Sequence, residues 1–204
     1  MHRANGHDRP SSHAVSSEIL TNPSPTFAHS QAVDFGPQLT NIKAANVDLL
    51  FFGGLDGQAG LIARRMKQLG MHAQFLGGGA VADTVFTQIA GDSAEGAMAW
   101  EYGRPLSALP RGAEFADNFK RKFGTGNLTY SPFAYDATML AMETMKSAKS
   151  TKPATLVAAL QKAQFTGITG TIAFDNHGDL KKPASTLYKL SGGKWVTVTT
   201  SSGD

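Results

Sequence analysis

The sequence predicts an α/β fold, in which a parallel sheet is followed by an antiparallel finish. Up to about residue 103, short apolar runs ending in glycine alternate with segments whose apolar residues recur every three or four positions. The next stretch has helical periodicity alone, and the tail alternates as strands do. At 204 residues, with 41% hydrophobic and 17% charged, the chain can bury a substantial core.

The first part of the chain is expected to alternate helix and strand. Gly70 ends one helix, Asp83 caps the next, and strands separated by helices imply parallel pairing. We expect helices at 35–42, 59–69 and 83–90 and strands at 48–52, 74–76 and 97–100.

The second part is expected to be helical and then to return to strands. Without a strand between the helices, the chain should leave one sheet, cover another and come back. Ser191-Gly192-Gly193 should join the last two strands as a hairpin. We expect helical stripes at 115–123, 134–145 and 156–160 and strands at 171–174, 185–190 and 194–198.

Composition and charge exclude several functions. A net charge of +3 with dispersed Lys and Arg disfavours nucleic-acid binding, and the absence of cysteine excludes disulfides and thiolate chemistry. No apolar run reaches the roughly 18 residues needed to insert in a membrane. The first 31 residues lack the basic stretch and apolar core of an export signal, so none is expected.

Residues 1–32 are expected to be an irregular, disordered segment. They have no sustained period and contain four of the six histidines. A metal cluster of these histidines is disfavoured, because neither their spacing nor a carboxylate partner resembles a defined site: His2, His7, His13 and His29.

Two glycine-rich loops at strand ends are candidate ligand contacts. Gly77-Gly78-Gly79 could present N–H groups to an anion, but it lacks the Lys-Ser/Thr of a nucleotide loop, so a tight turn is an equal alternative. Asp56 could contact a ligand or cap the next helix, with even weight on each. The segment 175–179 is expected to be a turn rather than a calcium loop. No nucleophile, metal set or paired carboxylates emerge, so we expect neither an enzyme nor a cofactor.

Between Val33 and about Val198 the chain contains six distinctive strings: DFGPQLTNIKAANVDLLFFGG, GGLDGQAG, FLGGG, IAGDSAEG, YSPFAYDA and GITGTIAFDNHGDLKKPASTLYKL. In this order and spacing they resemble the leucine/isoleucine/valine-binding proteins, which are periplasmic receptors of branched-chain amino acid ABC transporters. The resemblance implies a type I periplasmic-binding fold, with two Rossmann-like lobes joined by hinge strands and closing on one amino acid.

The resemblance also implies a division of the chain. Residues 33–103 would be the later part of the second lobe, 104–165 the returning helical part of the first lobe, and 166–204 the hinge recrossing with the carboxy-terminal strands. The signal peptide and most of the first lobe have no counterpart, so we expect an amino-terminally truncated, partial two-lobe architecture. A shifted reading frame or a misplaced start could account for residues 1–32.

By position in the family, the resemblance implies a ligand wall. Tyr135 matches a cleft tyrosine, and Leu55 matches a ligand-contacting position that is often aromatic. Asp56 and Gly78 accompany them in the two loops. Gly79 stands where an acidic residue pairs the ligand's ammonium in well-known branched-chain receptors, and a glycine offers only backbone there.

The function expected from the resemblance is capture of an amino acid for an ABC transporter permease, in the periplasm, or in the cytoplasm if no export signal precedes the chain. Because the part that would hold the ligand's carboxylate has no counterpart, the isolated chain should bind weakly or not at all. Two alternatives stay open, namely a cytosolic ligand-sensing regulator on the same fold and a small α/β phosphate-binding enzyme.

Overall fold

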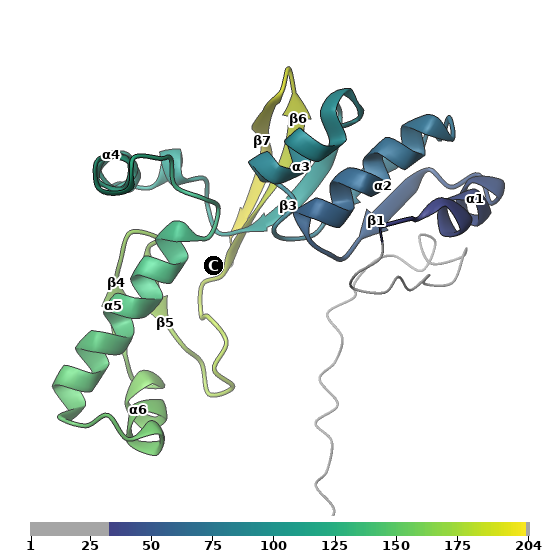
Figure 1. Cartoon of the computed structure of the whole chain (residues 1–204). Helices are drawn as coiled ribbons and strands as arrows, with labels where there is room; N and C mark the ends of the chain where they lie inside the picture. Colours follow the sequence, from purple (N-terminus) through teal and green to yellow (C-terminus); the bar gives the residue numbers. More distant parts are fainter. Residues whose placement is uncertain (1–32, 203–204) are drawn as a thin grey trace, which may run out of the picture.

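The computed structural model describes residues 33–202 (Figure 1). The expectations for residues 1–32, including disorder and the weighed histidine cluster, lie outside the described residues.

A five-stranded mixed sheet forms the larger part of the molecule. Its strand order is β1-β2-β3-β6-β7, with β1, β2 and β3 parallel and β6 antiparallel to both β3 and β7. The strands are β1 (Leu49–Phe52), β2 (Gln74–Gly77), β3 (Met98–Tyr102), β6 (Ala184–Ser191) and β7 (Lys194–Ser202). The predicted parallel sheet with an antiparallel finish is confirmed.

Three helices accompany the parallel strands: α1 (Gly36–Ala44), α2 (Asp56–Gln68) and α3 (Thr84–Ala90), followed by the short 3₁₀ helix η1 (Gly91–Ser93) (Figure 1). The predicted cap is confirmed, since the Asp83 carboxylate accepts a bond from the Val85 N–H at 3.0 Å. Gly70 follows α2 with φ +63°, a conformation that suits glycine at a helix end.

The core lies between these helices and the sheet. Phe86 is fully buried and stacks on Phe75 of β2, with ring centroids 5.8 Å apart, and packs against Trp195 of β7. Helices α2 and α3 approach closely at Gly60, where an added Cβ would lie 2.7 Å from the Ile89 Cβ. These contacts bind the predicted elements into one hydrophobic cluster.

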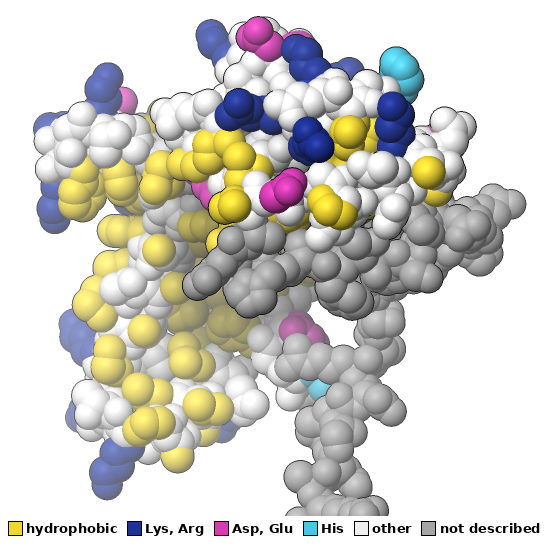
Figure 2. All heavy atoms as spheres, turned by 45° about the vertical axis from the view of Figure 1, so that its right-hand side comes forward, with side chains coloured by type: hydrophobic (Ala, Val, Ile, Leu, Met, Phe, Trp, Pro, Cys, Tyr) yellow, Lys and Arg dark blue, Asp and Glu magenta, His cyan; other side chains and the backbone are white. Residues whose placement is uncertain are grey.

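The second part of the molecule is mainly helical. It contains η2 (Leu106–Ala108), α4 (Gly112–Phe123), α5 (Ser131–Ala148) and α6 (Pro153–Leu160), with a separate pair of antiparallel strands, β4 (Gln164–Thr166) and β5 (Thr171–Ala173). Strand β4 was not predicted. Figure 2 shows yellow, hydrophobic side chains spread over this part. The large hydrophobic residues exposed here include Phe123, Tyr135, Met142 and Val157.

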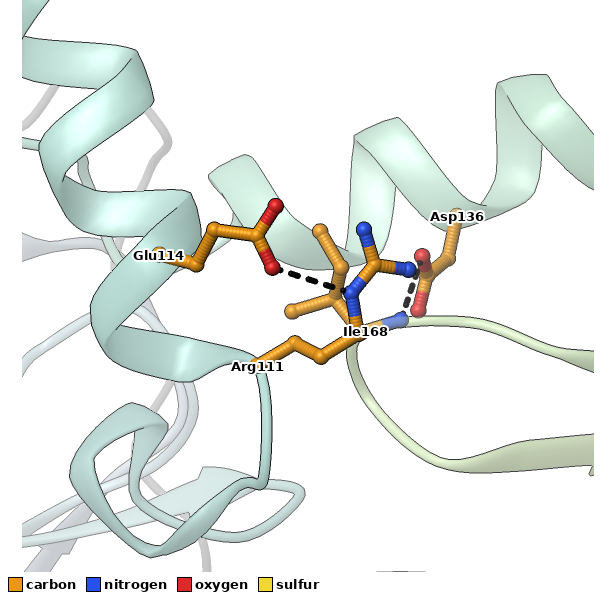
Figure 3. Close-up of polar contacts among 4 residues, drawn as sticks. All are labelled: Arg111, Glu114, Asp136 and Ile168. Atoms are coloured by element: carbon orange, nitrogen blue, oxygen red, sulfur yellow. Dashed lines mark hydrogen bonds and ion pairs between the residues drawn. The ribbon is translucent and has the colours of Figure 1, made fainter.

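One buried carboxylate joins α5 to the loop between β4 and β5. Asp136 has no exposed surface and accepts a bond from the Ile168 N–H at 2.9 Å (Figure 3). It also accepts from the Thr169 N–H at 2.7 Å. The Thr169 hydroxyl donates to the same carboxylate at 2.6 Å. Gly167 passes so close that an added Cβ would lie 2.4 Å from the carboxyl carbon. Asp136 therefore fixes this loop on the helix.

The chain passes from the sheet to the helical part after β3 and returns before β6. The two passages are tied side by side, because the Gly103 N–H donates to the Ala184 carbonyl at 2.7 Å and the Thr186 hydroxyl donates to the Gly103 carbonyl at 2.7 Å. Gly103 has φ +76°, and an added Cβ would lie 2.5 Å from the Phe133 ring. Only glycine fits this crossing without strain.

Most element ends differ from the predicted ones by a few residues, and two of these differences have a clear physical reason. Strand β3 continues to Tyr102 rather than ending at Trp100, because Glu101 and Tyr102 pair with Thr186 and Ser185 of β6. The strand expected at 171–174 ends at Ala173, and Phe174 pairs with Leu180 in an isolated bridge. Across residues 33–202, none of the helices combines the length and hydropathy that crossing a membrane requires.

Candidate ligand-binding site

The candidate site is built at the carboxyl ends of β1, β2 and β3, where ligands bind in open α/β sheets. After β1 the chain turns through Leu55, which precedes α2 in extended conformation and is 66% exposed. Asp56 is the first residue of α2. The capping alternative is not borne out in its usual form, because Leu55 occupies the cap position and the Asp56 carboxylate accepts only from the adjacent Gly57 N–H, at 2.7 Å.

The loop after β2 is held from behind by a buried acid. Gly78 donates its N–H to the Phe52 carbonyl at 3.0 Å, which joins the loop to the end of β1. The Glu101 carboxylate, only 2% exposed, accepts from the Ala80 N–H at 3.1 Å and the Ala82 N–H at 3.0 Å. Ala80 has φ +82°, which costs a non-glycine residue about 1–2 kcal/mol. The two bonds to Glu101 hold the loop in this strained shape.

Burial of Glu101 raises the pKa of its carboxyl group, against the lowering effect of the Ala82, Ala80 and Val81 backbone bonds. The Asp83 carboxylate adds a smaller raising effect. The site therefore contains a carboxyl group that is harder to ionise than a solvent-exposed glutamate.

Two tyrosines cover Gly79. An added Cβ would lie 2.8 Å from the Tyr102 ring and 3.2 Å from the Tyr130 hydroxyl. Burial raises the pKa of the Tyr130 phenol, and the charges of Glu101, Tyr102 and Asp56 raise it further. The Tyr130 hydroxyl and the Tyr102 ring therefore border Gly79, in the loop that the Glu101 carboxylate holds.

The structure brings four of the five predicted site residues to one edge of the sheet: Leu55, Asp56, Gly78 and Gly79. Tyr135 lies on α5 in the helical part. Its half-exposed ring packs edge-on against Phe115 of α4, with centroids 5.7 Å apart. Beside Tyr135, Arg111 and Glu114 form an exposed ion pair at 3.2 Å (Figure 3).

A cavity of about 190 Å³ adjoins the site where β3 passes into the helical part. Glu101 forms part of its wall together with polar and aromatic side chains: Tyr102, Arg104, Phe133, Tyr188 and Trp195. Burial raises the pKa of the Tyr188 phenol, and the Glu101 charge adds to the shift. The buried acid thus contacts both the loop after β2 and the crossing.

Sequence reasoning missed three residues of the site: Glu101, Tyr102 and Tyr130. A signal for Glu101 was available, since it shares strand parity with the buried Ala99 and so points inward. Tyr130 lies far along the chain from Gly79, and no local pattern relates them.

The predicted turn at 175–179 is confirmed, since the Asp175 N–H donates to the Asp179 carbonyl at 2.9 Å. The Asp175 carboxylate also accepts from the Asp179 N–H at 3.0 Å and the His177 N–H at 2.8 Å, and these bonds lower the pKa of that carboxyl group.

Parallel strands that end at an open, polar and aromatic edge, joined by paired crossings to a second part, are typical of the class of two-lobed ligand-binding proteins. The family model described as "Periplasmic binding protein" matches residues 20–194. The chain belongs to this family, whose members bind substrates rather than transform them.

The curated proteins similar to this chain are named for the amino acids that they bind. The Leucine-, isoleucine-, valine-, threonine-, and alanine-binding protein of Pseudomonas aeruginosa is 32% identical over 156 residues, which cover 76% of this chain and 42% of the relative. The Leu/Ile/Val-binding protein homolog 1 of Brucella suis is 31% identical, covering 78% and 43%. The chain thus spans less than half the length of these curated relatives.

Solved structures share the fold. The leucine-binding protein LivK of Thermotoga maritima superposes with a TM-score of 0.77 and 23% identity, covering 86% of this chain and 50% of that one. A solute-binding protein of R. palustris in complex with benzoate superposes with a TM-score of 0.69 and 21% identity, covering 83% and 47%. The predicted type I periplasmic-binding fold is confirmed.

Proposed function

We propose that the chain supplies one ligand-binding wall and the hinge crossings of the substrate-binding component of a branched-chain amino acid ABC transporter. The observation that carries the proposal is the pairing of an apolar side chain with a carboxylate at the sheet edge. Leu55 offers exposed apolar surface to an aliphatic side chain, and the adjacent Asp56 has one carboxylate oxygen beyond the Gly57 bond. That oxygen can pair the ligand's ammonium in place of the acid that position 79 lacks.

The proposed division of the chain follows the family. Residues 33–103 would form the later part of the second lobe, 104–165 the helical part of the first, and 166–204 the recrossing and final strands. The antiparallel addition of β6 and β7 to the sheet of β1 to β3 supports this division. The periplasm as its location and a transporter permease as its partner are the corresponding proposals.

The expected strength of binding follows from the exposure of this wall. Leu55 and Tyr102 are 66% and 68% exposed, so a ligand resting on them keeps much of its surface in water. We expect the chain alone to bind leucine with a Kd of roughly 1 mM or weaker, which corresponds to about −4 kcal/mol. Titration of leucine, isoleucine and valine, followed by NMR amide shifts on a chain with a cooperative thermal transition, measures it. Saturation at micromolar leucine would contradict the one-wall argument.

The role of Asp56 is tested by the isosteric variant Asp56→Asn. The asparagine oxygen can still accept from Gly57, while the charge that attracts an ammonium is gone. We expect leucine affinity to fall by roughly tenfold, as for loss of a charge-assisted hydrogen bond of about 1.5 kcal/mol. Asp92→Asn, an exposed change in η1 at the opposite end of β3, is the matched control. Equal leucine affinity in both variants would remove the carboxylate from the site.

An aromatic carboxylate is a second candidate ligand. Tyr102 and Tyr130 cover a Gly79 that carries no acid, and the R. palustris neighbour holds benzoate. The same variant separates the candidates, because Asp56→Asn should weaken leucine binding but leave or strengthen benzoate binding.

The two remaining alternatives are less well supported. A phosphate-binding enzyme would use the loop after β2, yet the carboxylates of Glu101 and Asp83 already accept its N–H groups and those of α3. Two carboxylates beside the loop disfavour an anion there. A ligand-sensing regulator would use the same wall, and permease and ATPase genes next to this one would favour transport instead.

A further inference from the structure

Glu101 occupies a position that the expected function does not explain. It is the second-last residue of β3, just before the chain leaves the sheet for the crossing. Its side chain is buried and points inward beneath the loop after β2. A buried carboxyl group costs several kcal/mol of desolvation unless its oxygens are hydrogen-bonded. Both oxygens of Glu101 are bonded, and both bonds go to the same loop.

The bonded loop is the one that carries Gly78 and Gly79. Ala80 directly follows Gly79 and has φ +82°. Two residues later, the Ala82 N–H donates to the Glu101 carboxylate. Because L residues rarely adopt that conformation unaided, an outside constraint is needed to hold it. The Glu101 carboxylate supplies the constraint by accepting from Ala80 itself and from Ala82 two residues later.

The held loop sets the shape of the candidate wall. Gly79 lies against Tyr102 and Tyr130 so closely that no side chain fits between them, and a shift of the loop would change the gap that these phenols border. Thr129, next to Tyr130, donates to the Ala82 carbonyl at 3.3 Å, so the segment before α5 follows the same loop. One buried acid thus fixes the relative places of the backbone and the rings.

We propose that Glu101 is a positioning residue for ligand binding: it holds the 78–82 loop in its strained conformation and so presets Gly79 and the two tyrosines that border it. The inference rests on the proposed function, because it concerns the same site. It adds a residue that touches no ligand and acts through the loop.

The titratable and charged groups around Glu101 come from several elements. Asp83 follows the loop, Tyr188 lies on β6, Tyr130 precedes α5, and Tyr102 and Arg104 share the cavity wall with it. A carboxylate accepts both N–H bonds, whereas a protonated carboxyl group has one oxygen that donates instead. The loop should therefore move when Glu101 gains a proton.

The test compares Glu101→Gln with Glu95→Gln. Glu95 precedes the other end of β3 and also accepts a backbone bond, from the Gly192 N–H at 3.2 Å, but it lies outside the candidate site. Amide spectra of both variants and of the unchanged chain are recorded with and without leucine. We expect Glu101→Gln to shift the amides of residues 78–82 and to weaken leucine binding by roughly tenfold, since small misplacements at a site have effects of this order or larger. Glu95→Gln should do neither.

A pH titration of the unchanged chain gives a second measurement that needs no variant. The amides of Ala80 and Ala82 should titrate together at a pH above the ordinary glutamate value of 4.5, and that transition should vanish in Glu101→Gln. Loop amides that keep their positions in Glu101→Gln, or leucine affinity equal to that of the unchanged chain, would overturn the inference. If the unchanged chain gives no response even to leucine far above 1 mM, the leucine site proposed on this wall fails, while the loop amides still decide whether Glu101 positions the loop.

Discussion

Removing the Asp136 carboxylate is expected to destabilise the helical part of the molecule severely. Asp136 has no exposed surface and accepts from two backbone N–H groups and one hydroxyl. Asp136→Ala leaves the N–H groups of Ile168 and Thr169 without an acceptor. Each buried donor left unpaired costs about 1–3 kcal/mol, so the loss should be about 2–6 kcal/mol. This is a large share of a typical stability of about 5–15 kcal/mol.

A second variant separates the contributions of the two Asp136 carboxylate oxygens to the free energy of unfolding. Asp136→Asn keeps the volume and one acceptor oxygen, so roughly half of the loss should return. Equilibrium urea unfolding followed by circular dichroism measures both changes through α4 to α6. Tryptophan fluorescence reports the sheet separately, because Trp100 and Trp195 lie on β3 and β7.

An exposed aspartate serves as the control. Asp117→Ala, on the surface of α4, should change stability by no more than about 0.5 kcal/mol. If Asp136→Ala also lowers the free energy of unfolding by no more than about 0.5 kcal/mol, the reasoning that this carboxylate holds the loop to α5 is refuted. A shift seen by circular dichroism but not by fluorescence would show that the two parts unfold separately.

Two further predictions concern packing and pH. Gly60→Ala brings a Cβ within 2.7 Å of the Ile89 Cβ and 3.2 Å of the Phe86 carbonyl, so thermal or urea unfolding should show a net loss of about 1–2 kcal/mol despite better helix propensity. Its partner Gly57→Ala, whose Cβ meets only Ile89 at 3.9 Å, should gain about 0.5–1 kcal/mol, and equal effects of the two would contradict the steric argument. Because burial raises the folded-state pKa of Glu101, the unfolded chain loses that proton first, and the contribution of this group to stability should decline as pH rises from its ordinary value of 4.5. Unfolding of the unchanged chain and of Glu101→Gln across pH 4 to 8 measures the difference, and parallel curves would disprove the shift.

The order of the elements follows from the sequence, because the two periods and the glycine stops are local signals. Asp83, Gly70 and the hairpin at 191–193 act through neighbouring atoms, and each is where the pattern predicted. Strand β4 was not predicted because its three residues are too few to show an alternating pattern. Its partner β5 lies beyond a turn, so the pairing is not visible within the segment itself.

The candidate site was only half predictable for the same reason. The strand ends that carry Leu55, Asp56 and the glycines follow from the α/β pattern. Strand parity indicates that Glu101 points inward, but the partners that make its burial possible are amides about twenty residues earlier, which no local pattern indicates. The approach of Tyr130 to Gly79 is a tertiary contact, so only the folded chain displays it.

The paired crossings also limit how the two parts can move. A single connecting strand would allow the two parts to twist and tilt about any axis. Two strands that are hydrogen-bonded side by side resist twisting of one part relative to the other. The bonds between Gly103, Ala184 and Thr186 lie at this junction, and the positive φ of Gly103 places a pivot next to the Phe133 ring. We expect the remaining easy motion to be bending across the pair, which would bring the two parts together or apart along one direction.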